Sequence, residues 1–166
     1  MAQRSLLGDS DEGSGQDDFK TAMTKAGRHL ALRPHSVAEL GIKLRAFEPA
    51  IVEGVLARLE ELALLDDEAF AHTWVRERSR TRGPRALQAE LRAKGVTDEV
   101  IQAALEESGD ESQRAEALAA GYLRRVAHKP PAKQATSIQA MLLRRGFSMD
   151  VAIGAARQVL PPEGWD

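Results

Sequence analysis

From about Phe19 onward, apolar residues recur at intervals of three and four, which is the spacing of one face of an α-helix. Met23, Ala26 and Leu30 share such a face in a first helix that stops near Pro34. Runs that alternate apolar and polar residues, which are typical of strands, are scarce. The pattern therefore predicts an all-α fold.

Signals for helix starts divide this pattern into separate helices. Ser36 and Glu39 have the spacing of a capping box, in which the two residues satisfy backbone N–H groups reciprocally. Pro49 suits the first position of another helix, and Asp66 is a suitable N-cap for the next. We expect a helix to begin at each of these three places.

The pattern repeats itself three times along the chain. When Phe47, Val96 and Phe147 are taken as origins, the residues four, five, eight and nine positions later are all apolar. These twelve positions are Ile51, Val52, Val55, Leu56, Val100, Ile101, Ala104, Leu105, Val151, Ala152, Ala155 and Ala156. Upstream, the apolar pairs Leu40/Leu44, Leu87/Leu91 and Ile138/Leu142 correspond as well.

The residues around these pairs also correspond between copies. The pairs follow equivalent helix starts at Ser36, Gly83–Pro84 and Gln134. Gly95 and Gly146 stand just after the second and third pairs, where a left-handed C-cap conformation favours glycine. The corresponding turn of the first copy is shorter and has no glycine. We infer a unit of three helices, present three times, with a period of roughly 50 residues.

Such repetition predicts an elongated, curved array of three tandem three-helix repeats, because each repeat chiefly contacts its neighbours. The repeats are expected at residues 21–63, 64–109 and 110–160. Residues 1–20 are rich in Gly, Ser and acids, so we expect a disordered acidic tail there, and a short C-terminal tail at 161–166.

Charge alternates along the chain in step with the repeat, although the net charge is only −2. Residues 72–94 and 120–146 are basic, whereas residues 98–116 are acidic. In a regular array the basic regions would line up on one edge. The basic candidates for contact with a partner are Arg76, Arg78, Arg80, Arg82, Arg85, Arg92, Lys94, Arg124, Arg125, Lys133, Arg144 and Arg145.

Two interpretations of this charge pattern are open. The bands are either solvated helix faces in mutual charge balance or a surface for a partner. A basic edge suits phosphate or an acidic protein, whereas an acidic edge repels phosphate. The segregation favours the partner surface, and its two signs suit a protein or a nucleoprotein better than bare nucleic acid.

Patterns that would indicate an enzyme are missing from the sequence. The chain has 166 residues and no cysteine, which removes thiolate nucleophiles and thiolate metal sites. His29, His35, His72 and His128 are scattered without ligand spacing, and Gly83–Pro84 is a lone break rather than a phosphate loop. We therefore expect no catalytic residue, no cofactor and no metal.

The expected location is the cytoplasm. No apolar run approaches the roughly 20 residues that a membrane-spanning helix needs. The first residues also lack the basic and then apolar pattern of a signal peptide. These observations predict a protein without membrane contact, and we expect a monomer.

The middle of the chain resembles the RecX family of regulatory proteins. The resemblance rests on Leu-Leu-Asp-Asp-Glu-Ala-Phe-Ala at residues 64–71, Trp74–Val75, Gly83–Pro84 and Lys94–Gly95–Val96. It extends over nearly everything from about residue 26 to residue 160 and is most specific in the middle third.

This resemblance implies a bacterial, non-catalytic protein that binds the filament of the RecA recombinase on single-stranded DNA. Members of the family inhibit the ATPase, strand-exchange and co-protease activities of RecA by blocking filament extension or promoting disassembly. The family fold implied is the tandem three-helix repeat. The alternative hypothesis is a helical-repeat protein that binds single-stranded or double-stranded DNA directly through its basic edge.

Overall fold

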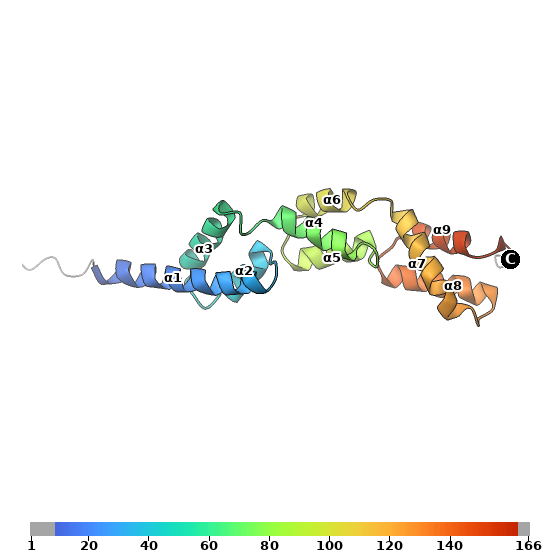
Figure 1. Ribbon diagram of the computed structural model, residues 1–166, viewed down its shortest axis with the longest axis horizontal. Helices are drawn as coiled ribbons and strands as arrows, with labels where there is room; N and C mark the ends of the chain where they lie inside the picture. Colours follow the sequence, from blue (N-terminus) through green and yellow to red (C-terminus); the bar gives the residue numbers. More distant parts are fainter. Residues whose placement is uncertain (1–8, 163–166) are drawn as a thin grey trace, which may run out of the picture. The chain divides into compact units, whose positions relative to one another are not determined.

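All regular secondary structure in the described residues, 9–162, of the computed structural model is helical (Figure 1). The helices are α1 (Asp9–Leu32), α2 (Val37–Lys43), α3 (Pro49–Glu61), α4 (Asp67–Arg78), α5 (Pro84–Ala93), α6 (Asp98–Glu106), α7 (Glu111–Val126), α8 (Pro131–Arg144) and α9 (Met149–Val159). The predicted all-α fold of three successive three-helix sets is confirmed. None of the twelve repeated apolar positions is exposed, because each faces the interior of its own set.

Packing divides the chain into two compact units. Unit 1 contains residues up to Phe70 together with Lys94–Val96, and unit 2 contains Ala71–Ala93 and the residues from Thr97 onward. The boundary therefore runs through the second set of helices. The three-repeat boundaries at residues 64 and 110 stay a prediction.

The structure differs from the expected disordered tail. Helix α1 begins at Asp9, so residues 9–20 are helical, and residues 1–8 lie outside the described part. The acidic residues of this stretch precede Phe19, which packs against the core of unit 1. The helix can extend backwards from that anchor, because adding residues to a formed helix is easier than starting one.

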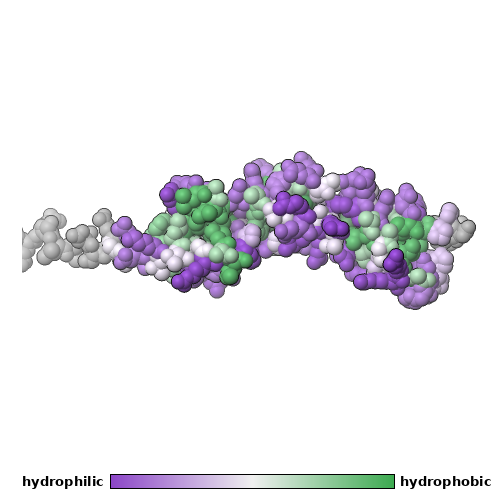
Figure 2. Space-filling view, viewed as in Figure 1, coloured by the Kyte–Doolittle hydropathy of each residue, from purple (hydrophilic) through white to green (hydrophobic). Residues whose placement is uncertain are grey.

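Unit 1 has a small core and an apolar surface. Ala22 and Ala26 of α1, Leu40 of α2 and Val55 of α3 are fully buried together. The large apolar side chains Leu32, Ile42, Leu62 and Leu64 remain exposed, and Figure 2 shows a hydrophobic area over this unit. The predicted basic residues, apart from Lys94, belong to unit 2.

Unit 2 is held together by a joint between the start of α5 and the turn after α8. The N–H group of Gly83 donates to the carbonyl of Arg145 at 2.7 Å, and the N–H group of Arg85 donates to the carbonyl of Gly146 at 3.1 Å. A Cβ at Gly83 would overlap the carbonyl carbon of Gly146. Gly146 itself has φ of +90°, which an L side chain adopts only with strain. Glycine is therefore required on both sides of the joint.

Unit 1 contains a second joint, in which a side-chain hydroxyl takes the place of the backbone N–H group. The hydroxyl of Ser36, which precedes α2, donates to the carbonyl of Lys94 at 2.5 Å. Gly95 has φ of +76°, and a Cβ there would overlap the side chain of Ala38 in the first turn of α2. In both joints a helix start rests on the glycine turn of the next repeat. The predicted left-handed glycines, Gly95 and Gly146, are confirmed.

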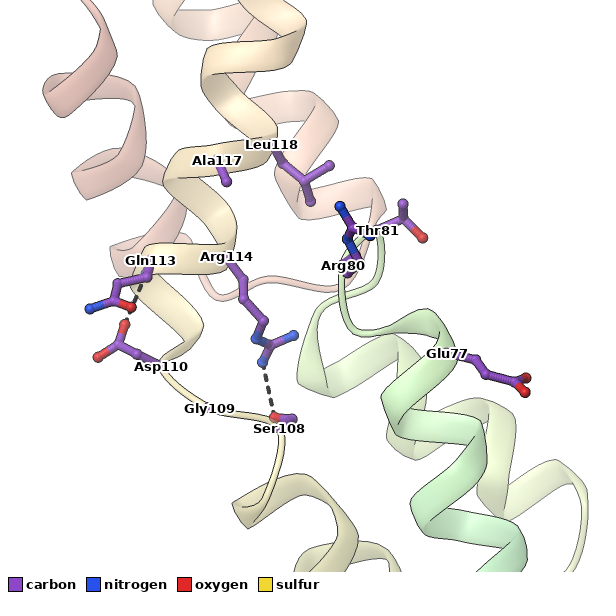
Figure 3. A pocket seen from close by; sticks show the side chains of 10 residues that line it. All are labelled: Glu77, Arg80, Thr81, Ser108, Gly109, Asp110, Gln113, Arg114, Ala117 and Leu118. Atoms are coloured by element: carbon purple, nitrogen blue, oxygen red, sulfur yellow. Dashed lines mark hydrogen bonds between the residues drawn. The ribbon is translucent and has the colours of Figure 1, made fainter.

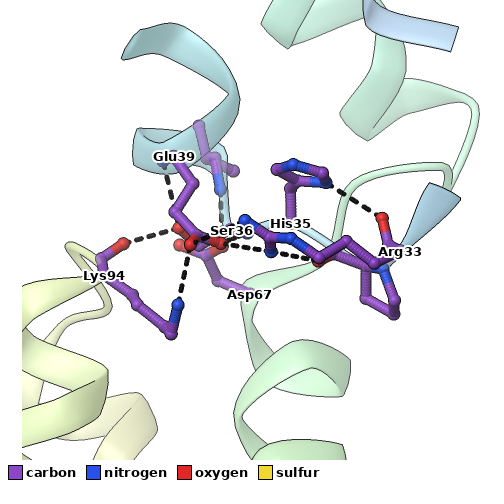
Figure 4. Close-up of polar contacts among 8 residues, drawn as sticks. Arg33, His35, Ser36, Glu39, Asp67 and Lys94 are labelled. Carbon is purple, nitrogen blue, oxygen red and sulfur yellow. Dashed lines mark hydrogen bonds and ion pairs between the residues drawn. The ribbon is translucent and has the colours of Figure 1, made fainter. Parts of the chain in front are cut away.

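A partly buried carboxylate strengthens the joint of unit 1 (Figure 4). Glu39 accepts hydrogen bonds from Arg33 at 3.2 Å, from the Nζ of Lys94 at 2.7 Å and from the N–H of Ser36 at 3.2 Å. Burial pushes the pKa of Glu39 up, but these three hydrogen bonds outweigh it and lower the pKa from 4.5 to about 2. The predicted capping box at Ser36 and Glu39 is present and is also a contact between repeats.

One predicted helix start is wrong. The third set was expected to open its second helix at Gln134, but α8 begins at Pro131. The side-chain amide of Gln134 instead donates to the carbonyl of Lys129 at 2.7 Å. Proline is favoured at the first helical position because it has no N–H to leave unsatisfied, and this signal outweighs the polar side chain of Gln134.

We expect Gly83→Ala to lower the free energy of unfolding by about 1–3 kcal/mol, because the added methyl group overlaps backbone atoms that cannot move independently. Gly121→Ala in the interior of α7 is the matched control, since a Cβ there meets nothing within 4 Å. It should raise stability by about 0.5–1 kcal/mol. Urea unfolding measures both changes. Equal free energies of unfolding for the two variants would contradict the claim that the joint requires glycine at position 83.

The pKa of Glu39 predicts a dependence of stability on pH. Because the folded pKa of about 2 lies below the ordinary 4.5, the contribution of Glu39 is complete above pH 4.5 and is lost as the pH falls toward 2. We expect the stability of the wild-type protein to fall more steeply over this range than that of Glu39→Gln. Glu53→Gln, on the exposed face of α3, should retain the wild-type slope.

Candidate partner interface

The loop between α4 and α5 is the meeting point of three segments of unit 2. Besides the backbone bonds at Gly83 and Arg85, the guanidinium of Arg145 donates to the carbonyl of Thr81 at 3.1 Å. Arg114, from α7, reaches the same loop and donates to the carbonyl of Ser79 at 2.8 Å. The loop is thus fixed at several of its backbone carbonyls, which determines where the side chains that it carries begin.

These contacts bring five of the predicted basic residues together. We call them the arginine cluster: Arg80, Arg82, Arg85, Arg144 and Arg145. Arg82 lies 3.5 Å from a carboxylate oxygen of Glu90. Within the described part of the chain, the exposed side chains of Arg80, Arg85 and Arg144 form no hydrogen bond or ion pair. The cluster therefore presents positive charge that its surroundings leave uncompensated.

Arg85 is of particular interest because of its position in α5. It is the second residue of this helix, directly after Pro84. A cation in the first turn of a helix is disfavoured by the helix dipole. Arg144, by contrast, lies in the last turn of α8, where the dipole favours it. Local helix stability therefore explains the position of Arg144 but not that of Arg85.

Three of the other predicted basic residues are engaged in local contacts. The guanidinium of Arg78 lies 3.4 Å from the centre of the Trp74 ring, Arg92 pairs with Asp98 at 2.6 Å, and Lys94 pairs with Glu39 at 2.7 Å. These side chains are less available to a partner than those of the arginine cluster. Whether they contact one stays a prediction.

The remaining predicted basic residues lie elsewhere. Arg124 and Arg125 end α7, and Lys133 lies near the start of α8. Lys133 and Arg144 are separated by eleven residues of α8, which corresponds to about 16 Å along the helix axis. Arg76 is exposed on α4 and, in the part of the chain that the structure describes, has only a long contact of 3.4 Å with the Thr73 hydroxyl. The predicted basic edge therefore consists of one arginine cluster and several basic residues that lie apart from it.

Arg114 is a residue of this region that the sequence interpretation missed. Its guanidinium donates to the carbonyls of Ser79 and Arg82, at 2.8 and 3.3 Å, and to the hydroxyl of Ser108 at 3.2 Å. Burial lowers its pKa, against the opposing effect of Glu111 and Asp110. It satisfies carbonyls that the end of α4 leaves without partners. The signal was present, because Arg114 is the one basic residue in the acidic stretch 98–116.

A cleft lies beside the arginine cluster, between the end of α4 and the first half of α7 (Figure 3). It has a volume of about 790 Å³. Arg80 and Thr81 line one side, and Ala117 and Leu118 of α7 line the other. The cleft therefore combines an unpaired guanidinium with an apolar wall.

The described residues offer no other obvious chemical site. Among them, no group of three or more His, Asp or Glu side chains lies close enough to hold a metal ion. His72 of α4 lies 3.0 Å from a carboxylate oxygen of Glu107, but no third ligand joins this pair in the described chain. No helix in the described range is both long and apolar enough to cross a membrane.

Fold and surface together define a class of protein: a helical-repeat protein that presents a fixed arginine cluster at a joint between repeats. A family model described as the second three-helix domain of RecX matches residues 66–105. A "Regulatory protein RecX" of Mycobacterium sp. (strain JLS) is 43% identical over 136 residues, which cover 76% of this chain and 74% of the relative. A protein of the same name from Thermus thermophilus is 42% identical over 137 residues, with 82% and 90% covered.

The solved structures agree with these relatives. The crystal structure of RecX from Lactobacillus salivarius superposes with a TM-score of 0.78 and covers 87% of this chain and 97% of its own, at 24% sequence identity. That similarity shows the fold. From the sequence relationships, the chain belongs to the RecX family of regulatory proteins.

We expect Arg114→Ala to lower the free energy of unfolding by about 2–3 kcal/mol, because hydrogen bonds from a charged donor to otherwise unsatisfied carbonyls are lost. Gln113→Ala, at the preceding position, is the control. The side chain of Gln113 is exposed, so the free energy of unfolding should change by no more than about 0.5 kcal/mol. Thermal and urea unfolding measure the difference. An Arg114→Ala protein as stable as Gln113→Ala would refute the capping role.

Proposed function

We propose that this protein binds the RecA recombinase filament on single-stranded DNA and lowers the ATPase, strand-exchange and co-protease activities of that filament. It would act by blocking filament extension or promoting disassembly, as a cytoplasmic and non-catalytic regulator. Membership of the RecX family carries the proposal, since its relatives are named regulatory proteins.

The arginine cluster supports this proposal and suggests where binding occurs. Arg80, Arg85 and Arg144 are exposed and lack partners within the described chain, and they lie in or beside the segments that the joint fixes. Because the backbone of these segments is already ordered, binding restricts only the side chains. A filament of protein on DNA offers both carboxylates and phosphates to such groups.

The ATP turnover of RecA on single-stranded DNA tests the proposal. We expect the wild-type protein to lower the steady-state rate, with complete effect at a several-fold excess over filament subunits. The double variant Arg85→Glu with Arg144→Glu should need at least about tenfold more protein for half inhibition, because both changes replace attraction by repulsion. Arg28→Glu, on the exposed face of α1, is the control for a charge reversal outside the arginine cluster.

Two outcomes would contradict this account. Unchanged ATP turnover at a several-fold excess of the wild-type protein would remove the proposed function. Equal inhibition by the double variant and by Arg28→Glu would leave the function standing but would exclude the arginine cluster as its site.

Direct DNA binding is the second candidate function, and the unpaired arginines favour it. It predicts tight binding to bare DNA at physiological salt, with an affinity that falls steeply as salt rises, because bound counterions are released from the phosphates. Binding that appears only when RecA is present would exclude this as the main activity.

A further inference from the structure

The cleft beside the arginine cluster lies entirely within unit 2. One wall is the last turn of α4 with the residues that follow it, and the other is the first half of α7. Its volume of about 790 Å³ lies within the range of pockets that hold drug-sized ligands. It is large enough to receive side chains of another molecule rather than water alone.

The acids that line this cleft are already engaged. Glu77 pairs with Arg78 at 3.2 Å, and Figure 3 shows its side chain directed away from α7. The carboxylate of Asp110 caps α7 by accepting from the N–H of Gln113 at 2.8 Å. Neither carboxylate forms an ion pair with Arg80 or Arg114 among the described residues. Both carboxylates therefore already have partners other than Arg80.

The cations of the cleft, by contrast, lack carboxylate partners. Arg80 has no hydrogen bond or ion pair in the described chain, and Arg114 donates only to carbonyl and hydroxyl oxygens. The Nε of Arg114 is also buried without a hydrogen-bond partner. The guanidinium of Arg80, which lines the cleft and forms no ion pair within the described chain, favours a carboxylate brought by another molecule.

The apolar wall of the cleft favours a ligand that also carries an apolar group. Ala117 is exposed and Leu118 is half-buried against the core of the third helix set. The phosphate groups of a nucleic acid are charged and have no apolar group to place against this wall. A protein segment can place one carboxylate beside Arg80 and one apolar side chain against Leu118.

We propose that the cleft between α4 and α7 receives an acidic segment of a protein partner, with a carboxylate paired to Arg80 and an apolar side chain against Ala117 and Leu118. This inference rests on the proposed function, so the segment would belong to the recombinase of the filament. It assigns the cleft to protein contact rather than to DNA contact.

Photocrosslinking tests this assignment directly. The exposed Ala117 is replaced by the photoreactive amino acid p-benzoylphenylalanine, and the full chain is mixed with RecA filaments formed on single-stranded DNA with a slowly hydrolysed ATP analogue. We expect crosslinks to the recombinase, in a peptide that contains Asp or Glu. Crosslinks to the DNA, or to a recombinase peptide without an acid, would overturn the proposal.

Binding affinity supplies the second measurement. Arg80→Glu should weaken binding to the same filaments by at least about tenfold, and Arg80→Gln by less, because Gln removes the attraction without adding repulsion. Arg28→Glu is the control, and circular dichroism verifies that each variant is folded. The inference would be overturned if the Arg80→Glu variant is folded and binds the filaments with the same affinity as the Arg28→Glu variant. A wild-type protein that does not bind the filaments would overturn both this inference and the proposed function.

Discussion

Backbone hydrogen bonds from the start of α5 to the turn after α8 are the constraint on which the functional surface depends. Gly83 and Arg85 donate to Arg145 and Gly146, and the absence of side-chain atoms at the two glycines allows this close approach. Because the contact uses main-chain atoms, the side chains of Arg80, Arg85 and Arg144 are left for the surface. The same contact places residues from two repeats in one cluster. A joint made of side chains would have consumed some of these arginines.

The design of the joint also explains why it occurs twice. At the turn after α2 the first repeat has no glycine and, in the described chain, no residue there has a positive φ. At the start of α8, Pro130 stands where Gly83 precedes α5, and proline has neither the N–H group that Gly83 donates nor a hydroxyl like that of Ser36. The turn after α2 and the start of α8 therefore lack what a further joint requires. The missing glycine of the first copy, which looked like a departure from the pattern, follows from its place at the end of the array.

Much of the fold was predictable because it depends on local signals. The periodicity gave the helices, the Ser36–Glu39 spacing gave a capping box, and Gly95 and Gly146 marked left-handed turns. The start of α8 was predicted wrongly because the polar residue Gln134 was taken as the helix start, whereas the helix begins at Pro131. The helical residues 9–20 were missed because composition alone does not reveal that Phe19 anchors them.

The candidate site was predictable only in part, since it depends on contacts between distant residues. The list of basic residues contained the arginine cluster, but the sequence did not separate Arg80 and Arg85 from Arg92 and Lys94, whose charges are paired within the fold. Arg114 joins the site through carbonyls more than thirty positions away, as the bond to Ser79 shows. Such pairings depend on the packing of α7 against the loop after α4.

Amide hydrogen exchange at Gly83 and Arg85 tests the joint most directly. Both residues lie at or next to a loop, at a helix start whose own N–H groups have no partner within the helix. If they donate to Arg145 and Gly146, their amide protons should exchange as slowly as those in the middle of α5, at a rate set by opening of unit 2. Exchange at the rate of a free loop would contradict the joint and the fixed arginine cluster that depends on it.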